Sequence, residues 1–385
     1  MRSSLSGLCA ILLAATCAHA IEAPKSQTET APNESASTAK IVPTDEAQFY
    51  EQLQRVTHWR NLRGLHVPQT AIDDLARGHD DLARGHADRA VALLGDAAAK
   101  GSEEANIALV RIQHWCSRVG SARSPNIEEQ IDKLGSILPP ERAARAAGVL
   151  QADAAFMPRA AQGCRNARID YGAIEDRLRE AADAGKSASA TELAQFTRDP
   201  RMRDALLEAA AKKGYAPAMY AVATRRVIDV QRAERTEDVA SIRLYLKQAG
   251  TTMPKAKVDL ANCMALGCDG HPADASSARA FGIDAARDGE PTAFLSMARM
   301  PWGGRMSRAQ LLAWQYFGDR LNEAGCMGDA YIMHATAFAQ AIGALTRNAE
   351  EALLEKAREQ AEQLWKDFSA RAMKEQGCSA IPPAA

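Results

Sequence analysis

A short pattern, Ala-Ala followed by two residues and a glycine, recurs along this chain of 385 residues and constrains its fold more than any other feature. Its four full copies lie at 97–101, 181–185, 210–214 and 285–289. Weaker copies end at Gly250 and Gly325. Small alanines let neighbouring helices approach closely, and glycine adopts the left-handed backbone at a helix end without a Cβ penalty. The pattern therefore predicts a series of helices that each end at a glycine.

The spacing of these glycines predicts how the helices are grouped. From Gly185 to Gly325, successive copies are 29 to 39 residues apart. Eight residues after a glycine comes an apolar residue that we expect to be buried: Leu109, Leu193, Val222, Val258 and Met297. A repeat of this length is typical of helix-turn-helix units that bury their faces only against their neighbours.

Composition supports a helical fold and argues against a polyanionic partner. Aromatic residues make up only 5% of the chain, and good helix formers such as Ala, Leu, Arg, Glu and Gln dominate it. The formal net charge is −1, which gives no reason to expect a nucleic acid as partner. We therefore predict an all-α protein built as an α-solenoid.

The segment from Asp274 to Ala293 carries the most complete copy of the repeat. Its key positions are Asp274, Ala278, Phe281, Ala285, Ala286, Gly289 and Ala293, preceded by Gly267 and Gly270. This segment resembles the Sel1-like repeat, a relative of the tetratricopeptide repeat. It departs from that pattern at Gly282, where an aromatic residue is usual, and 117–171 contains no clean copy. The resemblance implies a helical scaffold that acts as an adaptor.

The N-terminus has the pattern of an exported protein. Residues 1–20 combine Arg2, an apolar run at 8–15 and an Ala-His-Ala end, which predicts a signal peptide cleaved near Ala20. The residues before Cys17 do not match a lipid-attachment motif, so no lipid anchor is predicted. The run is too short to span a bilayer, and no later stretch qualifies. We expect a periplasmic or secreted protein.

The rest of the chain divides by composition and periodicity. The regions are a disordered linker at 21–43, a helical region with degenerate repeats at 44–170, the repeat array at 171–345, a C-terminal capping helix at 346–378 and a tail at 379–385. The first expected helix starts at Thr44 and contains Phe49, Leu53, Val56 and Trp59. In the last helix, Asn348 and Glu351 predict a capping box, and the predicted apolar stripe is Leu354, Ala357, Ala361, Leu364, Trp365 and Phe368.

Six cysteines follow the predicted signal peptide, and an even number in an exported chain favours disulfides. Sequence order suggests the pairs Cys116 with Cys164, Cys263 with Cys268, and Cys326 with Cys378. The middle pair needs only a short turn. Zinc binding by Cys263, Cys268 and His271 is an alternative, but an oxidising compartment favours the disulfide.

A short tandem duplication near the start places His79 and His86 seven residues apart. On one helix, this spacing would put both histidines on one face, and Leu75 and Leu82 on another. A paired-histidine metal site is conceivable, but metal-binding histidines on one helix are normally three or four residues apart. We therefore interpret the duplication as a surface segment and predict no metal site.

The sequence contains none of the catalytic motifs that we sought, and we expect no enzymatic activity and no cofactor. The predicted function is that of a scaffold in the cell envelope that binds a protein or peptide. Candidate partner-binding residues on the first helices of the pairs are Arg279, Asp284, Arg287, Lys212 and Arg243. The alternatives are an envelope hydrolase acting on cell-wall or β-lactam-like substrates, and a structural component of a secretion or envelope complex.

The aromatic residues near a Gly-rich turn at 301–305 allow two interpretations. Trp302, with Trp314 and Phe317 nearby, could form a recognition pocket for a peptide or a glycan. The interpretation that we favour has Trp314 and Phe317 packing the next helix pair, with only Trp302 exposed and available to a partner.

Overall fold

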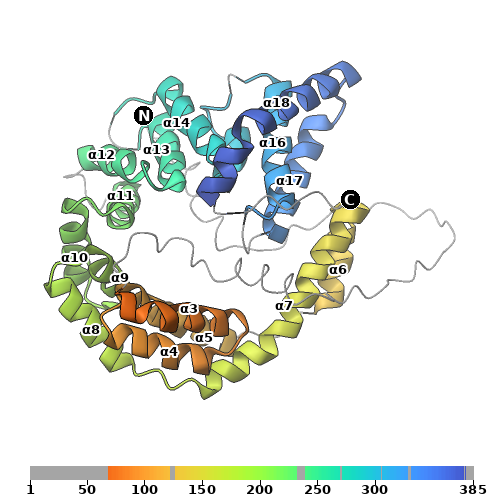
Figure 1. Cartoon of the computed structure of the whole chain (residues 1–385). Helices are drawn as coiled ribbons and strands as arrows, with labels where there is room; N and C mark the ends of the chain where they lie inside the picture. The colour runs from red at the N-terminus through yellow and green to blue at the C-terminus, as the bar shows by residue number, and fades with distance from the viewer. Residues whose placement is uncertain are drawn as a thin grey trace. The chain divides into compact units, whose positions relative to one another are not determined.

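The computed structural model describes residues 68–121, 126–231, 239–268, 271–304, 306–327, 331–376 and 378. Every regular element in these ranges is a helix, as predicted (Figure 1). The predicted signal peptide at 1–20, linker at 21–43, helix that begins at Thr44 and tail at 379–385 lie outside the described residues. Among the described helices, none is long and apolar enough to cross a membrane.

Five consecutive helix pairs form the array. They are α8 (Tyr171–Asp183) with α9 (Ser187–Phe196), α10 (Pro200–Lys212) with α11 (Ala216–Gln231), α12 (Val239–Ala249) with α13 (Pro254–Leu266), α14 (Ala275–Arg287) with α15 (Pro291–Arg299), and α16 (Arg308–Glu323) with α17 (Tyr331–Thr346). Helices adjacent in sequence contact one another along the array. We call α8, α10, α12, α14 and α16 the first helices of the pairs.

The repeat glycines form the turns within most pairs. Gly185, Gly214, Gly289 and Gly325 have φ between 77° and 85°, the left-handed conformation that the pattern predicted. Gly250 is an exception, because it has no positive φ and a longer turn through Thr252 leads to α13. The weak copy at Gly250 therefore marks the end of α12 without a left-handed glycine.

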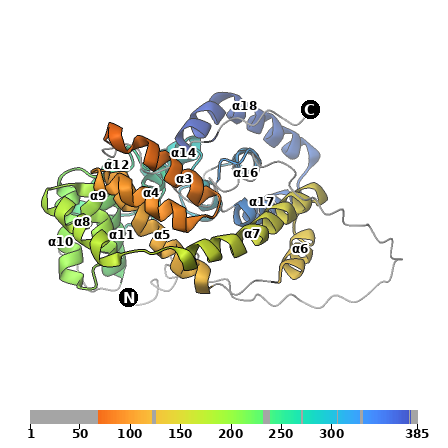
Figure 2. The same cartoon turned by 60° about the horizontal axis from the view of Figure 1, so that its bottom comes forward.

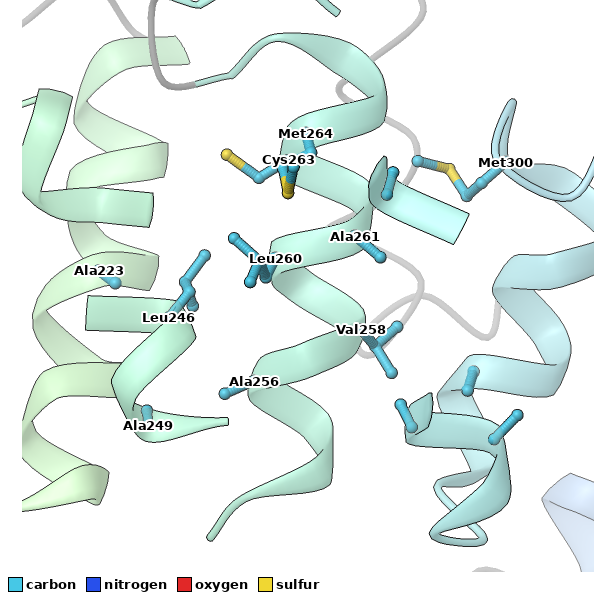
Figure 3. Close-up of a cluster of buried hydrophobic side chains, with 14 of the residues drawn as sticks. Ala223, Leu246, Ala249, Ala256, Val258, Leu260, Ala261, Cys263, Met264 and Met300 are labelled. Carbon is cyan, nitrogen blue, oxygen red and sulfur yellow. The ribbon is translucent and has the colours of Figure 1, made fainter. Parts of the chain in front are cut away.

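The core forms between successive helices of the array. The five apolar residues that follow the glycines by eight positions are all buried, each at most 4% exposed. Figure 3 shows part of this cluster, in which Leu246 of α12 and Leu260 of α13 lie between the backbones of neighbouring helices. Many members are alanines with no exposed surface, such as Ala223, Ala256 and Ala261. Small side chains thus set the close spacing of the helices.

The described part of the chain begins with a short 3-10 helix, η3 (Gln69–Ala71), followed by the helices α3 (Ile72–Ala83), α4 (Ala87–Ala99) and α5 (Glu103–Ser121). Leu75 and Leu82 are both buried, as expected for residues on one helical face. The prediction that both histidines share a helix is wrong. Helix α3 ends at Ala83, and His86 lies in the turn after Gly85, whose φ is 81°.

The stretch that lacks repeat copies forms α6 (Ile127–Gly135) and the long helix α7 (Pro140–Asn166). The C-terminal half of α7 packs against α4 and α5, where a Cβ atom on Gly163 would lie 2.5 Å from the carbonyl oxygen of Gly85. The N-terminal half of α7 contacts α17 (Figure 2). Helix α7 therefore connects the first described helices with the last pair of the array.

The C-terminal helix α18 (Glu351–Gln376) packs on two first helices, α16 and α14. Its predicted apolar stripe faces the core: Ala357 is fully buried, and Leu364, Trp365 and Phe368 pack against the main cluster. The predicted capping box is wrong. Asn348 has φ 56° in the turn after α17, and the carbonyl of Glu350 accepts the first hydrogen bonds of α18.

Candidate functional site

Of the three residues on α14 that we predicted for partner binding, Asp284 and Arg287 are contacted by α18. Asp284 accepts hydrogen bonds from Lys257 of α13 and from Arg371 of α18, at 2.5 and 2.7 Å. The guanidinium of Arg287 lies 4.8 Å from the ring centre of Phe368 on α18. A partner can therefore reach these two side chains only where α18 leaves them uncovered.

Asp288 completes an ion-pair network at the end of α14. Its carboxylate is almost fully buried and binds both Lys257 and Arg371, each within 2.7 Å. Burial alone would raise the pKa of Asp284, but the hydrogen bonds from Lys257 and Arg371 outweigh it and lower that pKa below its ordinary value. Asp284 thus faces α18 as a charged acceptor, and Asp288 shares its two cations.

The prediction that Trp302 is exposed is wrong, because its side chain is only 1% exposed. The indole Nε1 donates to Oδ1 of Asn262, and the Trp302 carbonyl accepts from Nε of Arg279. A Cβ atom on Gly282 would lie 2.5 Å from the indole. Trp302 therefore occupies the space left where Gly282 replaces the aromatic residue usual in the repeat, and Arg279 holds it in place.

Trp314 and Phe317 pack in the core, as our favoured interpretation expected. Trp314 is 7% and Phe317 1% exposed. The ring of Phe317 meets that of Phe294 at 6.0 Å edge-on, and Trp314 stacks on Phe368 of α18 at 6.4 Å. These aromatics join α15, α16 and α18, and they belong to the same buried cluster as Trp302.

The remaining two candidates lie on first helices that α18 does not cover. Lys212 is exposed at the end of α10, and Arg243 is half-buried on α12. Two exposed apolar side chains on the same helices were missed in the sequence: Met202 at 40% and Leu244 at 51% exposure. Neither residue differs from core residues in type, so only its position opposite the buried face of each helix could have indicated it.

A second charged contact joins α7 to the last pair. Both terminal nitrogens of the Arg142 guanidinium donate to the carboxylate of Asp319 on α16. Asp319 is 3% exposed. Arg145 pairs with Glu323, which also accepts from the hydroxyl of Tyr331 at 2.9 Å. Burial raises the pKa of Asp319 to about 6, although Arg142 opposes it.

The six cysteines form three disulfides in the pairs that sequence order suggested: Cys116 with Cys164, Cys263 with Cys268, and Cys326 with Cys378. Since Cys263 and Cys268 are bonded to each other, they offer no thiolates to zinc, and His271 lies exposed beyond them. The third bond ties the end of α18 to the turn that follows α16.

The histidines of the duplication have different neighbours. His79 lies 3.4 Å from a carboxylate oxygen of Glu104, and His86 lies 3.6 Å from Asp81. Within the described residues, no three or more His, Cys, Asp and Glu side chains form a group that could hold a metal ion.

Partly buried polar side chains lie on the second helices α11 and α13 and at the start of α15. The hydroxyl of Tyr220 donates to Asp259 at 2.7 Å, and Glu290 accepts from the backbone and hydroxyl of Thr292 at the start of α15. Burial raises the pKa of both carboxyl groups above their ordinary values. The Tyr220–Asp259 bond therefore joins α11 to α13, whereas the bonds of Glu290 cap α15 itself.

Comparison with known proteins gives structural matches only. No family model and no curated protein matches this chain. One match is a protective antigen of uropathogenic Escherichia coli with an SLR fold, at 14% identity and a TM-score of 0.43. It covers 82% of this chain but 65% of the antigen, so this chain spans less than two thirds of its length. A second is a Sel1 repeat protein from Oxalobacter formigenes, at 20% identity and a TM-score of 0.33, covering 78% of this chain and 94% of that one. Both are repeat proteins of the kind that the segment at 274–293 resembles.

Proposed function

We propose that this protein is an exported repeat scaffold that binds a segment of another protein through the first helices of its pairs, without a covalent step. Export is supported by the signal-like pattern of residues 1–20 and by three disulfides, which persist in oxidising compartments. Repeat arrays commonly use one extended face for binding, because equivalent helices present side chains side by side along the array.

The observation that carries this proposal is the presence of exposed apolar side chains on α10 and α12, namely Met202 and Leu244. Lys212 and Lys247 are exposed on the same two helices. A buried apolar anchor supplies affinity at an interface, and neighbouring cations select the partner by charge. The best-fitting partner is a segment that combines apolar side chains with carboxylates.

In-cell crosslinking of the tagged mature protein tests the proposal. The variant Met202→Asp/Leu244→Asp should lose its dominant crosslinked partner, because it places two carboxylates on the proposed face. Met333→Asp is the matched control, since Met333 is 61% exposed but lies on a second helix, α17. Equal loss of the partner in both variants, or no loss in either, would contradict the assignment of this face. Sequencing the mature N-terminus tests export, with Ile21 as the expected first residue.

A further inference from the structure

The C-terminal helix α18 is bound to the array as a ligand helix would be. It contacts the first helices α14 and α16, which belong to two successive pairs. Its contacts with α16 include Ala357 near Leu312, Trp365 near Phe317 and Phe368 stacked on Trp314, and Cys378 beyond its end is bonded to Cys326. An amphipathic helix lying in a groove between helices is a common mode of peptide recognition.

The surface beneath α18 has an acidic end that is built independently of α18. Asp284 and Asp288 belong to α14, and Lys257, which binds both, belongs to α13. Two carboxylates and one ammonium leave one negative charge, and Arg371 of α18 supplies the missing cation. The side-chain amide of Gln376 also donates to the carbonyl of Asp288 at 2.9 Å. Charge complementarity therefore selects a cation at this position.

Beside the acidic end, the same surface binds the aromatic side chains of α18. Phe368 stacks on Trp314 and sits under Arg287, and Trp365 meets Phe317 edge-on at 6.0 Å. Arg320 of α16 lies 4.1 Å from the ring of Trp365. The array thus offers two aromatic rings and two guanidinium groups to an aromatic pair spaced three residues apart, an arrangement that gains from both apolar burial and cation–π attraction.

Helix α18 is held to this surface by a short connection and one covalent bond. Residues 347–350 join it to α17, and the Cys326–Cys378 disulfide fixes its far end. Its outer side is polar, with exposed residues that include Glu355, Arg358, Glu359, Lys366 and Lys374. Linkage at both ends gives α18 a high effective concentration at the groove, so that a free helix competes only when one link is opened.

We propose that the surface of α14 and α16 beneath α18 is a helix-binding groove that α18 fills while the Cys326–Cys378 bond is intact. After reduction of that bond, the groove accepts a partner helix with two aromatic residues three positions apart and an arginine three positions further on. Reduction by a thiol reductant transfers two electrons and two protons to the protein, so that Cys326 and Cys378 become thiols and the reductant becomes a disulfide. This inference rests on the proposed binding role and names the partner of a second, self-occupied site.

The test measures binding of a fluorescent peptide of residues 351–376 to full-length variants by anisotropy. In Cys326→Ser/Cys378→Ser/Arg371→Glu, both the covalent bond and the cation of α18 are removed, so the peptide should bind. The same peptide with Arg371→Glu should bind at least tenfold more weakly. The control chain carries Cys326→Ser/Cys378→Ser/Arg358→Glu, because the ion pair of Arg358 is with Glu351 of α18 itself and not with the acidic end of the groove. The peptide should bind this control at least tenfold more weakly.

Equal binding of the two peptides, equal binding to the two chains, or no binding to either chain would overturn the proposal. Hydrogen exchange provides a second measurement that does not depend on the peptide. In Cys326→Ser/Cys378→Ser, the amides of α18 should lose at least tenfold in protection while those of α14 and α16 keep theirs; serine variants are used because a reductant also acts on the other two disulfides. Loss of protection in all three helices, or in none, would also overturn it. Crosslinking through Met202 and Leu244 is a separate readout, so failure here leaves that test intact.

Discussion

Two arginine–aspartate contacts hold long helices against the end of the array, and they differ in how their carboxylates are neutralised. In the α7 contact, Asp319 is buried with Arg142 as its bonded cation. In the α18 contact, Asp284 and Asp288 share Lys257 and Arg371. The pKa of Asp319 is raised to about 6 and that of Asp284 is lowered. The comparison teaches that burial, weighed against the paired cations, decides how easily an aspartate is kept charged, since the side chain of Asp319 is 4% exposed and that of Asp284 is 38% exposed.

The largest expected effect comes from the disulfides that secure α7 and α18. Cys116–Cys164 spans 48 residues and Cys326–Cys378 spans 52, so removing either by Ser substitution should destabilise the protein by a similar amount, about 4 kcal/mol in the chain-entropy picture. Removing Cys263–Cys268, with a separation of 5, should cost only about 2 kcal/mol. Urea unfolding of the three variants checks this order. A larger loss for the short bond than for the long ones would show that native contacts, and not chain entropy, dominate.

Arg142→Met should break the α7 contact in a pH-dependent way. Above pH 6, Asp319 is charged, and loss of its guanidinium partner leaves a buried charge, at a cost of about 3 kcal/mol. At pH 5 Asp319 is mostly protonated, so the cost should be smaller. The pKa of Asp319, followed by carboxyl NMR, should rise above 6 in this variant.

Arg371→Met is the matched change in the α18 contact, and it should cost about 1 kcal/mol because Lys257 remains. A pH-independent cost for Arg142→Met would contradict the comparison.

The two contacts should also give opposite pH dependences of stability. Because the folded-state pKa of Asp319 is above its unfolded value, the folded protein loses stability as pH rises from about 4 through 6, by roughly 2 to 3 kcal/mol. Asp284 has a lowered pKa in the folded protein, so it stabilises the fold at pH values above its unfolded-state pKa. This stabilisation is lost as the pH falls through its folded-state pKa. Unfolding of Asp319→Asn and Asp284→Asn, each compared with the parent protein between pH 3 and 8, separates the two. Differences of the same sign would show that the assigned pKa directions are wrong.

The array could be predicted because its signals are local. The glycine pattern determined most helix ends, and the apolar residue eight positions later was buried after five of the six glycines; Met333, eight residues after Gly325, is 61% exposed. Local rules failed where the packing partner lies far away in sequence. Trp302 fills the space over Gly282. In the sequence, the signal for this packing was a glycine at a position that is usually aromatic, together with a tryptophan nearby.

The predicted binding residues illustrate the same limit. Asp284 and Arg287 lie on a first helix, as predicted, but the helix that covers them is more than 80 residues away along the chain. Sequence periodicity assigned α18 an apolar stripe without indicating which helices it would meet. Likewise, the segment 140–166, which forms α7, carries no copy of the repeat in its sequence. Its role in joining α4 and α5 to α17 follows only from contacts such as that of Gly163 with Gly85.

The smallest expected effect tests the exposed charges around each contact. Arg320 and Glu362 in the α18 contact form an ion pair with side-chain exposures of 47% and 61%, and Glu362→Gln should change stability by less than about 0.5 kcal/mol. Glu323→Gln in the α7 contact should cost more, since Glu323 is 26% exposed and accepts hydrogen bonds from both Arg145 and Tyr331. Thermal unfolding at 0.1 and 1 M salt distinguishes the pairs, because salt screens exposed charges most. If Glu362→Gln proved the more costly change, exposure would not be the property that ranks these charges, and the comparison of the two contacts would have to rest on their buried aspartates alone.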